Sequence, residues 1–417
     1  MRQREESHLI MSEEGVLGLM LMAILGFAAF SRRLEMSVVT MPLVFTAAGY
    51  LAHLAGAELV QAEAQLEVLK ILAEVTLVLI LFSDASQVRL SQLRKNAGIP
   101  LRMLLIGMPL SIALGTLVAF WVSPDQPWTL ALLVAAILTP TDAALGQAVV
   151  SDEAVPAHLR ESIAVESGLN DGLALPVVII AALAVVEASG GMPGETAGSL
   201  TQFGIAQITL GPIAGIIVGG AAAKLRDFAV GRDLATDAYQ GIFFLAAAFL
   251  CFVAAELIGG NGLIAAFVGG LTFGNLRKGK SAFVAEFMES EGQLLTMATF
   301  AIFGVVLVPA GLAHATWQTL ALAILFLTFV RIVPIMLALT GSGLAWREKL
   351  FLGWFGPRGL ASILFALLVA ETYQIPGLDE LIACVVLTVM LSILVHGASA
   401  FPIVRAFAGA KSRGPAS

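Results

Sequence analysis

The sequence is poor in charge and in cysteine, and each shortage excludes a class of protein. Only 13% of its 417 residues are Asp, Glu, Lys or Arg, about half the share found in an ordinary soluble domain. The two cysteines, Cys251 and Cys384, both lie in apolar stretches, where we expect small buried side chains and no disulfide framework. The segments between the apolar stretches are short. We therefore expect no enzyme module, no nucleotide-binding domain and no nucleic-acid partner.

Apolar residues and glycine are abundant instead. Hydrophobic residues make up 58% of the chain, and the mean hydropathy is +0.92. The 41 glycines suit helices that pack closely in lipid, because small residues let helix backbones approach one another. This composition predicts an all-α polytopic membrane protein, with residues 1–417 forming a single membrane domain and no soluble regulatory domain.

Apolar runs of membrane-spanning length recur along the chain. A transmembrane helix needs about 20 mostly apolar residues, and by that measure we count about thirteen spans. The predicted limits are 15–31, 37–56, 66–84, 99–122, 128–150, 159–187, 203–223, 237–257, 260–275, 291–313, 317–340, 349–371 and 379–404. The first run lacks a small-residue cleavage pattern, so we expect a retained helix and not a signal peptide.

Basic residues lie in alternate loops. Lys or Arg follows the first, third, fifth, seventh, ninth, eleventh and last spans, whereas the intervening loops contain none. The basic side of a membrane protein is usually cytoplasmic. The pattern predicts an N-terminus outside, a C-terminus inside and an odd number of spans; only Arg2 and Arg4 oppose it.

The fifth span contains Leu138-Thr-Pro-Thr-Asp142. Pro140 removes a backbone donor and disfavours helix at Thr139, so the helix should break there. Freed carbonyls, the hydroxyl of Thr141 and the carboxylate of Asp142 are the oxygen ligands that a dehydrated cation needs. A proline kink whose aspartate caps a half-helix is the structural alternative, and both can hold at once.

The sixth span contains Glu166-Ser-Gly-Leu-Asn-Asp171. Glu166 and Asn170 are four residues apart, as are Ser167 and Asp171, so the four line one polar face of a helix. The opposite directions of the fifth and sixth spans place Asp142 and Asp171 at similar depth. Two carboxylates that lie close together hold a proton more readily, as a site that exchanges H⁺ for a cation requires. A purely structural polar network is the alternative.

Two arginines lie in the last third of the chain inside predicted spans. Arg331 is a buried cation that needs an anionic partner, for which Glu166 is the best candidate. Gly356-Pro-Arg-Gly359 predicts a second helix break, in a span running opposite to the fifth, as expected of transporters built from inverted repeats. Arg358 could offset the helix dipoles there, or could reach the cytoplasmic surface.

Other ionisable residues have weaker signals. In the third span, Glu74 and Asp84 are candidates for the ion path, and Asp84 fits a helix cap equally well. His53, His158, His314 and His396 lie near predicted span ends with no metal-ligand spacing, so we interpret them as interfacial residues.

At these residues the sequence resembles the monovalent cation/proton antiporter-1 branch of the cation/proton antiporter superfamily, bacterial relatives of the eukaryotic sodium/proton exchangers. The resemblance covers essentially the whole membrane domain. It rests on Thr141-Asp142, Glu166 to Asp171, Arg331 and Gly356 to Gly359. It implies a thirteen-helix fold with inverted repeats and two interrupted crossing helices, a dimerisation domain and a mobile core, working as a homodimer by elevator-like alternating access.

The resemblance also implies roles for individual residues. Asp171 would carry the exchanged proton or cation, and Asp142, Thr141 and Ser167 would complete the Na⁺ ligands. Glu166 would pair with Arg331. Asn170 would mark an electroneutral exchanger. The usual Thr-Asp-Pro continuation is here Thr141-Asp142-Ala143, with Pro140 ahead of it. The third-span acidic ligand of some relatives does not align, which leaves Glu74, Ser83 and Asp84 in competition.

Together these features predict a secondary antiporter and not an enzyme. We expect it to exchange Na⁺ or Li⁺ for H⁺ one for one across a bacterial inner membrane, without a cofactor, in pH homeostasis and salt tolerance. A K⁺/H⁺ antiporter of the same fold is the first alternative. A cation channel and an intramembrane aspartyl protease are weaker ones, and the Gly-x-Gly-Asp sequence of such a protease is absent.

Overall fold

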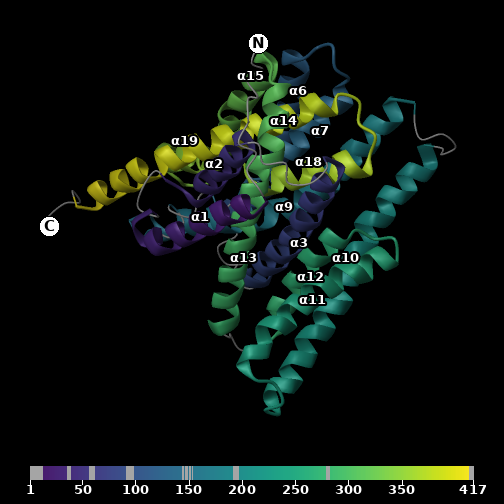
Figure 1. Cartoon of the computed structure of the whole chain (residues 1–417), viewed down its shortest axis with the longest axis vertical. Coiled ribbons are helices and arrows are strands. Elements are labelled where there is room, and N and C mark those ends of the chain that lie inside the picture. Colours follow the sequence, from purple (N-terminus) through teal and green to yellow (C-terminus); the bar gives the residue numbers. More distant parts are fainter. Residues whose placement is uncertain are drawn as a thin grey trace, which may run out of the picture.

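The computed structural model is helical throughout the part of the chain that it describes (Figure 1). It describes residues 13–34, 39–55, 62–90, 98–142, 145, 149, 152, 154–190, 197–278 and 282–412, and these contain no strand. The helices are α1 (Glu13–Leu34), α2 (Met41–Leu54), α3 (Ala62–Gln87), α5 (Gly98–Arg102), η1 (Met103–Gly107), α6 (Met108–Val122), α7 (Trp128–Leu138), α9 (Ala157–Ala188), α10 (Ala197–Gly231), α11 (Asp237–Leu257), α12 (Gly262–Leu276), α13 (Ala282–Ile302), η3 (Phe303–Leu307), α14 (Val308–Ala313), α15 (Trp317–Leu327), α16 (Phe329–Ala338), α17 (Trp346–Trp354), α18 (Leu360–Thr372) and α19 (Leu378–Ser412).

Seven helical segments are long and apolar enough to cross a membrane. Among the described residues they are Gly98–Val122, Ala157–Ala188, Ile205–Gly231, Tyr239–Leu257, Glu291–Ala313, Trp317–Ala338 and Leu378–Arg405. Shorter apolar helices occupy Gly18–Ser31, Met41–Leu54, Trp128–Leu138, Gly262–Leu276 and Leu360–Thr372. The all-α membrane class is confirmed, and every predicted span overlaps a helix. The number of thirteen crossings stays a prediction.

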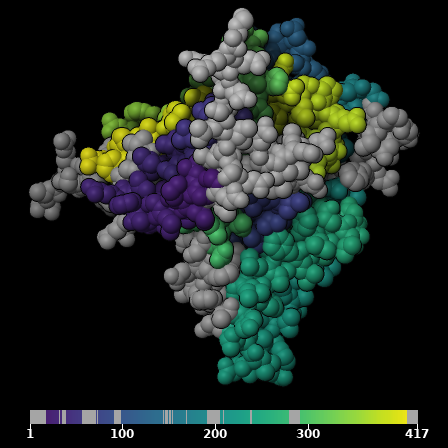
Figure 2. Space-filling view, viewed as in Figure 1, coloured from purple at the N-terminus to yellow at the C-terminus, as the bar shows by residue number. Residues whose placement is uncertain are grey.

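The helices α10, α11 and α12 lie side by side and form one continuous limb of the molecule (Figures 1 and 2). Gly215 and Gly219 of α10 lie against Gly269 of α12, so closely that a Cβ atom on either α10 glycine would collide with the α12 backbone. Glycine is therefore what allows these helices to touch, as expected for helices that pack in lipid.

Three predicted spans are less regular than the sequence indicated. Two of them contain a π-helical turn, η1 and η3, and each turn is followed by a proline near the start of the next helix, Pro109 or Pro309. Proline cannot donate the usual helical hydrogen bond, which explains the local widening. The span predicted at 317–340 is interrupted at Thr328, where φ is −118° and ψ is −88°. No proline or glycine lies at Thr328 to signal this interruption.

Residues 274–281, Gly-Asn-Leu-Arg-Lys-Gly-Lys-Ser, fit the GxxxxGK[ST] pattern of phosphate-binding loops. Such a loop binds phosphate between a strand and the N-terminus of a helix. Here Gly274 lies in the last turn of α12 and packs on the backbone of Ser86 in α3, and residues 279–281 lie outside the described residues. The match therefore gives no support for a nucleotide-driven pump.

Candidate functional site

The fifth predicted span breaks at its proline. The helix α7 ends at Leu138, and residues 139–142 continue without regular structure. The hydroxyl of Thr139 donates to the carbonyl of Ala135 at 2.6 Å, which closes the last turn of α7. The break predicted from Pro140 is confirmed, and it leaves Thr141 buried and Asp142 half-buried inside the protein.

The twelfth predicted span breaks beside the fifth. Its halves α17 and α18 are separated by residues 355–359. The backbone N–H of Asp142 donates to the carbonyl of Pro357 at 2.8 Å, and the Asp142 carboxylate accepts from the N–H of Leu360 at 2.8 Å. A third contact joins the Ser362 hydroxyl to the carbonyl of Ile137 at 2.9 Å. Asp142 thus caps the positive N-terminal end of α18, where an anion is favoured.

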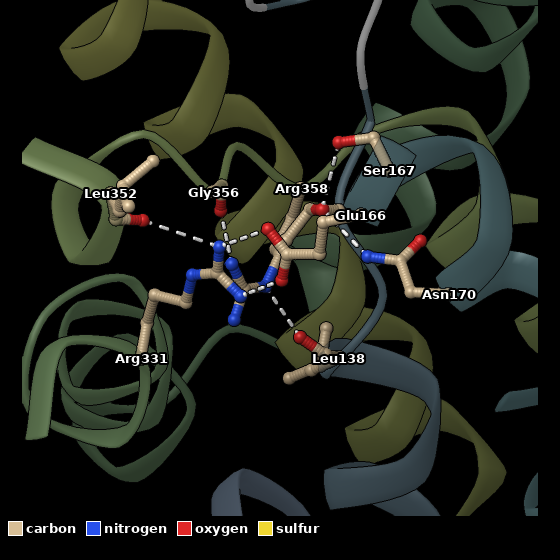
Figure 3. Close-up of polar contacts among 9 residues, drawn as sticks. Leu138, Glu166, Ser167, Asn170, Arg331, Leu352, Gly356 and Arg358 are labelled. Carbon is tan, nitrogen blue, oxygen red and sulfur yellow. Dashed lines mark hydrogen bonds and ion pairs between the residues drawn. The ribbon is translucent and has the colours of Figure 1, made fainter. Parts of the chain in front are cut away.

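Arg358 is completely buried between the two breaks (Figure 3). Its Nε donates to the carbonyl of Leu138, the last residue of α7, at 2.6 Å, and its Nη1 donates to the carbonyl of Gly356. A cation at the C-terminal end of a helix offsets the partial negative charge of the free carbonyls. Of the two sequence interpretations, the structure supports dipole compensation, because the side chain does not reach the surface.

The polar face of α9 meets the broken fifth span at Thr141. The Thr141 hydroxyl lies 3.0 Å from the hydroxyl of Ser167, and it accepts a hydrogen bond from the Asn170 amide at 2.6 Å. All three side chains are buried. One small cluster of oxygen atoms is therefore assembled from two spans, as the helical spacing of Ser167 and Asn170 indicated.

Glu166 and Arg331 form a buried ion pair (Figure 3). Only 2% of the Glu166 side chain and 3% of the Arg331 side chain is exposed. The contact is bidentate, with Arg331 Nη2 2.6 Å from Glu166 Oε2 and Nη1 close to Oε1. Arg331 Nη2 also lies 3.4 Å from the carbonyl of Leu352. The pair ties α9 to α16 and α17, and it leaves the carboxylate of Asp171 unpaired by arginine.

Two side-chain oxygens of this region are buried without a donor. They are Oδ1 of Asn170 and Oδ1 of Asp171, which have no hydrogen-bond partner among the described residues. Asp171 lies within electrostatic range of Asp142 and of Asp84 in α3. A buried acceptor without a donor is costly, so such oxygens indicate a position for a proton or a cation.

The two acidic candidates of the third span, Asp84 and Glu74, lie at different positions along α3. Asp84 interacts electrostatically with Asp142 as well as with Asp171. Glu74 lies ten residues earlier in α3, which is about 15 Å along a helix. No group of three or more His, Cys, Asp or Glu side chains in the described ranges has the arrangement of a metal site. The cluster is a mixed hydroxyl, amide and carboxylate site.

Several groups around the breaks have no signature in the sequence. The carbonyls of Leu138, Gly356 and Pro357 are backbone atoms, and Ser362 and Ser392 are single serines in apolar stretches. The interpretation of His396 as an interfacial residue is wrong, because only 1% of it is exposed and both ring nitrogens have partners. His53, His158 and His314 are exposed.

Comparison with known proteins identifies the group to which this site belongs. Residues 19–406 match the family described as sodium/hydrogen exchanger, transmembrane. The chain belongs to this family. It is thereby a multi-pass membrane protein of a transporter family and not an enzyme.

Relatives with curated names carry two cation assignments. The chain is 25% identical over 332 residues to the K⁺/H⁺ antiporter NhaP2 of Shewanella sp. strain ANA-3, which covers 79% of this chain and 56% of that protein. It is 27% identical over 366 residues to the probable Na⁺/H⁺ antiporter C3A11.09 of Schizosaccharomyces pombe, with 79% and 47% covered. The chain thus spans about half the length of these relatives.

A solved structure has the same fold. The sodium proton antiporter MjNhaP1 of Methanocaldococcus jannaschii superposes with a TM-score of 0.73 at 18% identity, covering 94% of this chain and 99% of that one. The predicted antiporter fold is confirmed by this match. In this chain the fifth and twelfth predicted spans are both interrupted, and residues of the two breaks contact each other.

Proposed function

We propose that this chain is a secondary antiporter that exchanges Na⁺ or Li⁺ for H⁺, one for one. The observation that carries the proposal is the buried Oδ1 atom of Asp171, which, like Oδ1 of Asn170, has no hydrogen-bond partner among the described residues. A single principal carboxylate holds either one proton or one monovalent cation. Alternation between the two states gives electroneutral exchange.

The cation ligands are oxygens of two spans. Asp171 and Asp142 provide carboxylates, and Thr141 and Ser167 provide hydroxyls 3.0 Å apart. Hard cations that lose water prefer such oxygens. Asn170 positions Thr141 through its amide and offers its own Oδ1. This ligand set contains no nitrogen or sulfur, which supports an alkali cation as cargo.

Asp84, Arg358 and Glu74 take different parts in the proposal. Asp84 lies within electrostatic range of both site aspartates, so it is the third-span acid of the ion path. Arg358 holds the end of α7 in place without binding the cation. Glu74 lies about 15 Å from Asp84 along α3. It is therefore outside the cation site and lines the ion path at most.

The wider arrangement follows the same proposal. The chain works in a bacterial inner membrane as a homodimer, with the N-terminus outside and the C-terminus in the cytoplasm. Basic loops on one side of the predicted spans support this orientation. A core that contains α7, α9, α17 and α18 moves against a dimerisation part, so that the site opens to each side in turn.

Purified protein in liposomes that hold a pH gradient tests the function. We expect Na⁺ or Li⁺ to dissipate the gradient rapidly, at a rate that is unchanged when the membrane potential is clamped. Activity with K⁺ alone would keep antiport but replace the cation, in line with the relatives named K⁺/H⁺ antiporters. Cation flux without proton counterflow would mean a channel, and no response to any cation would refute antiport.

A further inference from the structure

His396 lies in the middle of α19 and contacts the end of α17, while Ser392, one turn earlier in α19, contacts Arg358 within the break. The Nε2 of His396 is 3.0 Å from the carbonyl of Trp354, the last residue of α17. Its Nδ1 is 3.3 Å from the hydroxyl of Ser392, and that oxygen accepts the backbone N–H of Arg358 at 2.7 Å. Two residues of α19 therefore hold the two sides of the break. His396 holds the end of α17, and Ser392 holds Arg358, just before α18.

Each ring nitrogen of His396 lies near a carbonyl oxygen, Nε2 at 3.0 Å from Trp354 and Nδ1 at 3.1 Å from Ser392. Both carbonyls can only accept. The Ser392 carbonyl already accepts a backbone N–H within α19, so we assign the ring hydrogen to Nε2, which donates to Trp354. Nδ1 is then an acceptor for the Ser392 hydroxyl, whose own lone pair is used by Arg358. The charged groups that act on His396 are Arg358 and Arg331, and the latter is paired with Glu166. A neutral imidazole with hydrogen on Nε2 satisfies the contacts with the Trp354 carbonyl and the Ser392 hydroxyl.

The same break fixes Asp142 from the other side. Pro357 and Leu360 are the backbone partners of Asp142, and both lie within three residues of Arg358. A shift of residues 355–360 away from α19 would therefore move Pro357 and Leu360, and with them two hydrogen bonds of Asp142. A further contact, from the Trp354 indole to the hydroxyl of Ser399 at 3.0 Å, holds only the α17 end.

We propose that His396, together with Ser392, is a positioning residue that holds the broken twelfth span so that Asp142 keeps its place in the cation site. The inference rests on the proposed antiport function for its transport consequence. His396 does not touch the cation. It acts through the backbone of Trp354 and Arg358, and through them on the partners of Asp142.

Transport kinetics in liposomes distinguish positioning from a general role in folding. We expect His396→Ala to raise the apparent KM for Na⁺ by about tenfold, because small displacements of ligating groups weaken binding strongly. His396→Gln places an amide N–H near the position of Nε2 and should restore most of the wild-type KM, whereas the shorter His396→Asn should not. Thr388→Val is the matched control. Thr388 is buried two turns earlier on the same face of α19, and its hydroxyl donates only to Cys384 within the helix.

A KM within about twofold of wild type in His396→Ala would overturn the proposal. So would an equal loss in His396→Gln and His396→Ala, because the donor at Nε2 would then be irrelevant. The double variant His396→Ala/Ser392→Ala should raise KM by less than the product of the single effects, since both residues act through one contact chain. A rise in KM equal to the product of the two single effects would show that His396 and Ser392 act independently, which would contradict the proposal.

A spectroscopic measurement tests the contact between His396 and Trp354 without measuring transport. Nitrogen NMR of the wild-type protein labelled with ¹⁵N-histidine, with His396→Gln to assign the signal, should show a neutral ring with hydrogen on Nε2. A signal with hydrogen on Nδ1, or one averaged between the two forms, would overturn the hydrogen bond from His396 to the Trp354 carbonyl. If the wild type transports no cation, the proposed function fails, and this measurement alone still decides whether His396 holds the break.

Discussion

Asp142 and Arg358 each occupy the end of the other's broken helix. Asp142, from the break after α7, accepts the N–H of Leu360 at the start of α18. Arg358, from the break before α18, donates to the carbonyl of Leu138 at the end of α7. An anion thus faces a helix N-terminus and a cation faces a helix C-terminus, which are the favourable pairings with the helix dipoles. The two breaks are stabilised reciprocally, and the cation site that we propose lies where they meet.

This reciprocity predicts coupled losses of stability. We expect Asp142→Ala and Arg358→Gln each to lower the free energy of unfolding by about 1 to 3 kcal/mol, because each leaves a buried backbone group unpaired. The double variant should lose less than the sum, since the same crossing is disrupted twice. Thermal unfolding of the purified variants measures this, and Thr388→Val, whose hydroxyl contacts only its own helix, is the control. Strict additivity would contradict the coupling.

The ion pair of Glu166 with Arg331 predicts a larger effect. We expect Glu166→Gln to destabilise the protein by roughly 3 to 5 kcal/mol, because a fully buried arginine would lose its counter-charge. Replacing both partners, as in Glu166→Gln/Arg331→Met, should recover part of the loss. Fluorescence-detected gel filtration after heating gives the comparison. A single variant as stable as wild type would show that the pair does not hold α9 to α16.

Gly359 gives a test of the close approach between the breaks. A Cβ atom at this position would collide with the carboxylate of Asp142 and lie 2.8 Å from a methyl group of Leu145. We expect Gly359→Ala to displace Asp142 and to reduce exchange at least tenfold in liposomes. Gly26→Ala in α1, where nothing lies within 4 Å of the added atom, is the matched control and should be unaffected. Normal exchange by Gly359→Ala would remove Asp142 from the site.

The hydroxyl of Thr141 predicts a difference between two similar substitutions. Thr141→Val keeps the volume but removes the acceptor of the Asn170 amide and the partner of Ser167. We expect about a tenfold rise in the KM for Na⁺, equivalent to losing one buried hydrogen bond of about 1.4 kcal/mol. Thr141→Ser should stay near wild type. If both substitutions behave alike, the methyl group and not the hydroxyl is what matters at this position.

Much of the site could be predicted because its elements leave local marks in the sequence. Pro140 in an apolar span signals a break whatever the tertiary structure. The spacing of Ser167 and Asn170 puts them on one helical face, and a buried Arg331 requires an acid. The structure gives these residues the expected neighbours, although their roles in transport remain proposals.

The remaining features depend on tertiary contacts that the sequence does not encode locally. The partners of Arg358 are backbone carbonyls, which every residue has. The position of His396 in the final stretch of the last predicted span suggests an interfacial residue, but α19 continues to Ser412 and His396 is buried against the end of α17. Helix α13 begins at Ala282 and not at 291, because a helix can continue beyond its apolar part. An apolar composition predicts which residues of a helix span the membrane, but it does not predict where the helix begins or ends.

The most direct test is the number of protons that Na⁺ displaces from the purified protein. In a weakly buffered solution with a pH dye, we expect Na⁺ to release one proton per chain from wild type, because the cation and the proton compete for Asp171. The folded Asp171→Asn variant should release none, and Glu187→Gln, a carboxyl at the far end of α9, should behave as wild type. Proton release that persists in Asp171→Asn would contradict the central claim, since the competition would then lie on another group.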